Sequence, residues 1–157
     1  MIATLLLVLL CASIDFGRAL NYVQGLIELT RQGSMLASRG ATMAQAAAAV
    51  MAGESSLDMT NNGKVIITEV TNNKNAMTIT AQTTQGSGGA SCSSGCGSAV
   101  GSGVGSSATI PAAAAATIQS GQKLYVTEIY YSFAPITPIG KLTPIVMPSK
   151  LYQSAYF

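Results

Sequence analysis

The sequence predicts an α+β protein in which one long N-terminal helix packs on a small antiparallel β-sheet. Two observations carry this prediction. Residues 1–53 contain no proline and place apolar side chains at helical spacing, whereas residues 54–157 contain β-branched runs separated by turn residues. We therefore expect a helix over 1–53 and a sheet-containing head over 54–157.

The first part of the expected helix, residues 1–20, is an apolar segment. It carries no charge before Asp15 and Arg18. At about 1.5 Å per residue, a helix over 1–53 would be roughly 80 Å long, which is more than the head can cover. We therefore expect the apolar segment to be buried in lipid or in a filament core made by copies of this chain. The side chains expected at that interface are Met1, Ile2, Leu5, Leu6, Leu7, Val8, Leu9, Leu10, Ile14 and Phe16.

Two other interpretations of this segment compete with self-assembly. The uncharged run ends at Ile14, so it is shorter than the roughly 17–25 residues of a membrane span. A secretory signal peptide would place basic residues before the run, and this sequence has none there. Asp15 and Arg18 stand three residues apart, so they form either an intrahelical ion pair or a pair with charges on a neighbouring subunit.

The second part of the helix, residues 21–53, is amphipathic, with apolar or small side chains recurring every three or four residues. Small side chains let a helix approach another backbone closely. A glycine inside a helix costs about 1 kcal/mol, so a tertiary contact should offset each one. The residues expected to pack against the sheet are Leu29, Gly33, Leu36, Gly40, Met43, Ala47 and Val50.

The head contains three clear strand patterns and one weaker one. Residues 64–71 and 75–83 alternate β-branched and polar side chains around an Asn-rich turn, which predicts a hairpin. Residues 122–133 form the clearest strand, and a short final strand is expected within 152–157. We expect one antiparallel sheet with one face against the helix.

A Gly/Ser-rich stretch over residues 86–107 separates the hairpin from the later strands. Its composition is typical of a flexible surface linker. Cys92 and Cys96 lie within it, and we expect them to form a small local disulfide in an exported protein. Such a short loop would clip the stretch locally and stabilise the fold modestly.

Composition excludes several classes of function. Only 9% of residues are charged, against about 25% in an average protein. The basic residues are scattered, so binding of nucleic acid has no electrostatic basis. The chain has no histidine, which rules out a Ser–His or Cys–His nucleophile pair within it. We therefore expect no enzyme activity, no cofactor and no metal site.

Two stretches of the chain resemble the TadE-like proteins, which are pseudopilins of the tight-adherence (Tad) branch of type IV pilus systems. The first is Ile14-Asp-Phe-Gly-Arg-Ala-Leu20, which follows the apolar run and precedes the amphipathic helix. The second is Tyr125-Val-Thr-Glu-Ile-Tyr-Tyr131 with the prolines after it, and the closing residues 151–157 are also similar to that family. The Gly/Ser-rich middle has no counterpart in the resemblance.

The resemblance implies a precursor that is cut by a prepilin peptidase and held in the inner membrane before assembly. It also implies an export ATPase and a platform protein as partners, and packing of the N-terminal helices in a filament core. Type IV pilin-like proteins usually carry a glutamate at the fifth mature position, where this chain has Leu5. The ion pair made by that glutamate is therefore not carried over.

The sequence thus predicts a structural, pilin-like subunit that forms an extracellular helical homopolymer at the cell surface. The alternatives are a minor pseudopilin, or a membrane-anchored assembly protein that does not itself form the filament. A secreted binding module that retains a signal-like segment is a third hypothesis.

Overall fold

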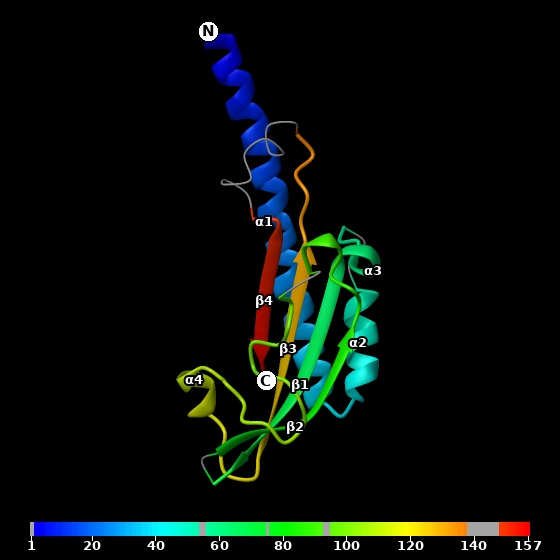
Figure 1. The fold of residues 1–157 in the computed structure, drawn as a ribbon, viewed down its shortest axis with the longest axis vertical. Helices are drawn as coiled ribbons and strands as arrows, with labels where there is room; N and C mark the ends of the chain where they lie inside the picture. Colours follow the sequence, from blue (N-terminus) through cyan, green and yellow to red (C-terminus); the bar gives the residue numbers. More distant parts are fainter. Residues whose placement is uncertain (1, 54–55, 75, 93–94, 138–147) are drawn as a thin grey trace.

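The computed structural model describes residues 2–53, 56–74, 76–92, 95–137 and 148–157. A long helix packs along one face of a twisted sheet, and its N-terminal end extends well beyond the sheet (Figure 1). This is the predicted α+β architecture. The helices are α1 (Ile2–Ser38), α2 (Met43–Met51), α3 (Met59–Asn62) and α4 (Ala112–Ala115), with a 3₁₀ turn η1 (Ala90–Cys92). The strands are β1 (Gly63–Asn73), β2 (Ala76–Gln85), β3 (Lys123–Ser132) and β4 (Lys150–Tyr156).

The helix expected over 1–53 is interrupted, so that part of the prediction is wrong. α1 ends at Ser38, and Gly40 adopts a φ of +97°, a left-handed conformation that glycine tolerates best. Thr42 then caps α2 by accepting the Gln45 N–H, while the Gln45 side chain accepts the Thr42 N–H. Gly40 is exposed, and a Cβ there would meet nothing within 4 Å, so it takes no part in the helix–sheet contact.

The sheet has the strand order β2-β1-β3-β4, and every neighbouring pair is antiparallel. Each of the four strands expected from the sequence is present. β1 pairs with β2 as a hairpin, with a register shift between Glu69 and Val70. β1 also pairs with β3, although about fifty residues separate them in the chain, and β4 returns to pair with β3.

One face of the sheet packs on α1 and α2. Alternate residues of β1 and β3, such as Val65, Ile67 and Ile129, point to this side and are fully buried with Leu26 and Leu29 of α1. Of the residues predicted to pack here, Leu29, Gly33, Ala47 and Val50 are buried, and Leu36 and Met43 are half-buried at the edge of the same core.

α1 lies directly against β3 at Gly33 and Ser34. A Cβ on Gly33 would lie 2.9 Å from side-chain atoms of both Thr127 and Val50, so only glycine fits without a shift. The neighbouring Ser34 hydroxyl donates to the carbonyl of Ala155 and accepts the Thr127 N–H, at 3.0 and 3.1 Å. Because Thr127 and Ala155 are paired across β3 and β4, this hydroxyl joins the helix to both strands.

The Gly/Ser-rich stretch is a loop between β2 and β3, as predicted, but the sequence did not show that it packs over the other face of the sheet. Val100 is buried against Val70, Ile79 and Val126, and Cys96 is buried against the sheet's Ile66 and Tyr130. Cys92 and Cys96 form the predicted disulfide. The described part of this stretch is therefore a third layer of the fold.

Three consecutive carbonyls at the disulfide accept hydrogen bonds from the head. The carbonyls of Gly95, Cys96 and Gly97 accept hydrogen bonds from the side chains of Lys150, Lys64 and Tyr130, respectively, at 3.3, 2.8 and 2.7 Å. The loop backbone is thus satisfied by side chains of β1, β3 and β4. This Gly/Ser-rich backbone is not solvated only by water, because long side chains of the sheet donate hydrogen bonds to its carbonyls.

Glu128 of β3 holds the part of the Gly/Ser-rich stretch that follows the disulfide. Its side chain is fully buried, and its carboxylate accepts hydrogen bonds from the Ser98 hydroxyl, the Ala99 N–H and the Tyr152 hydroxyl. Burial and the hydrogen bond to Glu128 raise the pKa of Tyr152 well above its ordinary value, which keeps it a donor. A buried carboxylate is tolerated here because three donors surround it.

We predict that Gly33→Ala destabilises the full chain by about 1–2 kcal/mol. Overpacking against Thr127 and Val50 costs about 1–3 kcal/mol, and the better helix propensity of alanine returns about 1 kcal/mol of that. The matched control is Gly17→Ala in the same helix, where a Cβ meets nothing within 4 Å and stability should rise by up to about 1 kcal/mol. Chemical denaturation in detergent measures both, and equal responses would contradict the close contact.

A second prediction concerns the outer layer. Glu128→Gln should cost about 1–3 kcal/mol, because an amide cannot accept from three donors and its NH₂ group faces one of them. Proteolysis within residues 86–107 should become faster. The control is Glu28→Gln on the exposed side of α1, which should change stability by less than about 0.5 kcal/mol. Unchanged protease resistance of Glu128→Gln would show that the carboxylate does not hold this layer.

Candidate functional site

The most unusual surface of the molecule is the exposed N-terminal part of α1, residues 2–14, which we call the stem. It projects past the end of the sheet in Figure 1. Its apolar side chains are exposed on all sides of the helix; Ile2 is 80% exposed and Leu10 is 62% exposed. Nine of the ten residues expected at an assembly interface are therefore uncovered, and Met1 lies outside the described residues. Those nine are Ile2, Leu5, Leu6, Leu7, Val8, Leu9, Leu10, Ile14 and Phe16.

An exposed apolar surface of this size is typical of a contact with another protein or a membrane. Contiguous apolar patches on soluble monomers rarely exceed about 300–600 Å², and larger ones mark contacts with proteins or membranes. Moving one large aliphatic side chain out of water is worth about 1.5–3 kcal/mol, so the stem offers a strong drive to association. α1 also contains a stretch long and apolar enough to cross a membrane, by length and composition.

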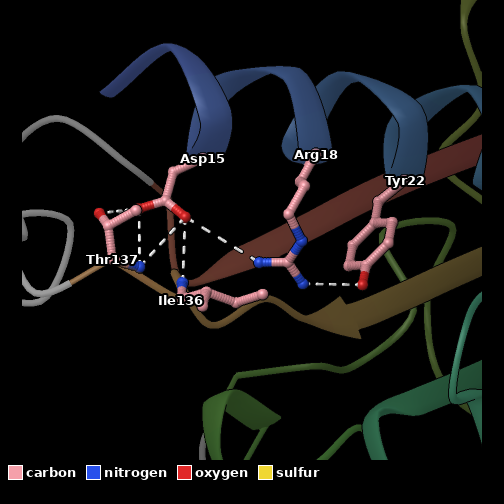
Figure 2. A network of polar contacts seen from close by, with 5 residues as sticks. All are labelled: Asp15, Arg18, Tyr22, Ile136 and Thr137. Atoms are coloured by element: carbon pink, nitrogen blue, oxygen red, sulfur yellow. Dashed lines mark hydrogen bonds and ion pairs between the residues drawn. The ribbon is translucent and has the colours of Figure 1, made fainter. Parts of the chain in front are cut away.

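Asp15, the first residue after the stem, attaches α1 to the head. Although it follows a run of exposed residues, its side chain is only 1% exposed. Its carboxylate accepts the N–H of Ile136 at 3.0 Å and both the N–H and the hydroxyl of Thr137, as Figure 2 shows. Asp15 therefore ties the helix to the segment that follows β3.

Arg18 lies one turn further along α1, between the helix and that segment. Its Nη2 donates to the Tyr22 hydroxyl at 3.0 Å (Figure 2). Its guanidinium also lies over the rings of Tyr22 and Phe133. Its Nη1 is 4.0 Å from the Asp15 carboxylate, the longest distance that counts as an ion pair. The predicted intrahelical pair is thus present but loose, and Asp15 makes its stronger contacts with Ile136 and Thr137.

Sequence reasoning missed the partner of Asp15. Thr137 lies 122 residues away in the chain, and nothing in the local pattern of either residue links them. The available signal was the acidic side chain itself, because a carboxylate among apolar helical positions must find donors when it is buried.

The head offers further polar groups near this contact. Tyr131 packs edge-on against Tyr22, with 5.5 Å between the ring centroids, and burial raises the pKa of Tyr131. Within the described ranges, no three carboxylate, thiol or imidazole groups come together in a way that would hold a metal ion.

Comparison of the chain with protein-family models, with curated proteins and with solved structures finds no match. The resemblance to TadE-like proteins therefore rests on the sequence motifs alone.

We predict that Asp15→Asn loosens the link between the stem and the head. The amide keeps one acceptor but presents an NH₂ group to the donors of Ile136 and Thr137. Amide hydrogen exchange at those two residues should accelerate by roughly fivefold or more, since each lost buried hydrogen bond is worth about 1 kcal/mol. The control, Asp58→Asn, alters the exposed cap of α3 and should leave exchange at 136 and 137 unchanged. Equal exchange in the two variants would contradict the proposed link.

Proposed function

We propose that this protein is a structural, pilin-like subunit that assembles into an extracellular helical filament through its stem. The observation that carries the proposal is the stem itself: a rigid helix that is apolar on all sides and that the chain's own head leaves uncovered. A helix of this kind suits a site where several neighbours surround it.

The arrangement of stem and head favours an open polymer over a closed pair. The stem lies at one end of the molecule and the head at the other, so a stem that packs beside a neighbour's helix makes a head-to-tail contact. Contacts between two different surfaces build filaments when the rotation does not close. The head would then form the outer surface of the filament, and the stems would form its core.

The same stem supports a stage in the inner membrane before assembly. The helix is long and apolar enough to enter a bilayer, and the first charges, Asp15 and Arg18, come where the head begins. Processing by a prepilin peptidase and handling by an export ATPase and a platform protein are part of this proposal through the family resemblance alone.

A minor pseudopilin or a membrane-anchored assembly protein is the second candidate. The same apolar helix favours it, because one helix in lipid satisfies the stem without any polymer. The two candidates differ in where the full chain accumulates, and that difference can be measured.

The test is negative-stain microscopy of sheared cell-surface material, with mass spectrometry to identify the subunit. We expect filaments that contain this chain. A chain that stays monomeric in the membrane fraction would overturn the filament proposal in favour of the membrane-anchored candidate.

A substitution sharpens the test. Leu6→Asp places a carboxylate in the proposed core, where burying an unpaired charge costs several kcal/mol, so filament yield should fall by at least about tenfold. The control, Val104→Asp, puts the same charge on an apolar side chain that is 71% exposed in the outer layer. It should leave assembly intact. Filaments of normal yield from Leu6→Asp would contradict packing of the stem in the core.

A further inference from the structure

A cavity of about 300 Å³ lies beside α1 just past the stem. This volume is at the lower end of the range for small-ligand pockets. Its polar lining consists of Arg18 and Tyr22 of α1, Asn62 at the end of α3 and Ser132 at the end of β3, with the ring of Tyr131 behind them. The cavity therefore opens at the level where the apolar stem gives way to the polar head.

The groups around this cavity have an excess of hydrogen-bond donors. Arg18 carries only donors, and because its Nη2 already donates to the Tyr22 hydroxyl, the Tyr22 proton is left to donate elsewhere. The Nη1 of Arg18 is buried and makes no hydrogen bond in the described structure, although it lies 4.0 Å from the Asp15 carboxylate. No acidic side chain among the described residues lines the cavity, and the Asp15 carboxylate, which is loosely paired with Arg18, accepts its hydrogen bonds from Ile136 and Thr137. Such a donor set selects an oxyanion.

We propose that this cavity binds the phosphate group of an anionic lipid while the stem is in the membrane. The inference rests on the proposed membrane stage of the subunit. From Ile2 to Arg18 the helix rises about 24 Å, and a bilayer's hydrocarbon core is about 30 Å thick, so a stem whose tip stops about 6 Å short of the far face places Arg18 at the near headgroup region. Arginine makes charge-assisted hydrogen bonds to phosphate oxygens, and tyrosine is enriched at this depth.

An acidic side chain of a second copy is the competing occupant. The position of the cavity favours lipid, because it adjoins the stem and so lies beside the bilayer surface whenever the stem is inserted. Three of the chain's six acidic residues, Asp15, Glu69 and Glu128, are each engaged by donors within their own subunit. A lipid phosphate needs no particular alignment of two subunits to reach Arg18.

The test is native mass spectrometry of the full-length chain in non-ionic detergent. The probes are phosphatidylglycerol, phosphatidylcholine and inorganic phosphate. We expect one phosphatidylglycerol to be retained at least about tenfold more than phosphatidylcholine, with little displacement by inorganic phosphate, because the acyl chains hold the lipid at the stem. Arg18→Gln should abolish this preference. The matched control is Arg31→Gln on the same helix, since Arg31 lines a different groove next to β4; it should retain the lipid like the wild type.

Three results would overturn the inference. They are equal lipid retention by Arg18→Gln and Arg31→Gln, displacement of the lipid by inorganic phosphate at equal concentration, and loss of filaments in Arg18→Gln with lipid retention unchanged. The last result would identify a neighbouring subunit as the occupant. Arg18→Lys guards against misfolding, because it keeps the charge and should retain more lipid than Arg18→Gln at the same thermal stability.

A measurement on the wild-type chain needs no variant. The Arg18 Nε–H signal in a nitrogen–proton correlation spectrum should shift on titration with phosphatidylglycerol and stay in place with phosphatidylcholine, and an unmoved signal would contradict binding at this cavity. Lipid retention is measured on single chains, so its result tests the lipid site independently of filament formation.

Discussion

The contact of Gly33 and Ser34 with the sheet is the constraint on which the rest of the structure depends. Gly33 lets the backbone of α1 reach Thr127, and the Ser34 hydroxyl then joins the helix to β3 and β4 at once. This fixes both the distance and the alignment of the helix relative to the sheet. Because α1 is a single rigid rod as far as Ser38, the direction of the stem is set by a contact about thirty residues away from its tip.

Much of the fold was predictable because its signals are local. Alternation of β-branched residues located β1, β2 and β3, and helical periodicity located the face of α1 that includes Leu29 and Gly33. The break at Gly40 also had a local signal, since Thr42 and Gln45 have the spacing of a capping box. Apolar and small residues continue across the turn without a change of period, and this continuity concealed the break.

The features that sequence reasoning missed depend on partners far apart in the chain. The Gly/Ser-rich stretch is ordered by donors from Lys64, Lys150 and Tyr130, and composition alone cannot show that such donors will face it. In the same way, the donors to Asp15 come from the segment after β3. The apolar stem of the proposed assembly site could be predicted from residues 1–14, whereas its attachment to the head could not.

The direction of the strands relative to α1 has a mechanical consequence. β3 and β4 run alongside α1 over much of the head (Figure 1), and Ser34 and Asp15 tie the helix to β3, β4 and the segment after β3 at two separate heights. A pull along the stem therefore loads these hydrogen bonds in shear, together with the apolar contact between them. Bonds loaded in this way share the force and must fail together, so a stem held from one end transmits tension to the head without peeling away from it.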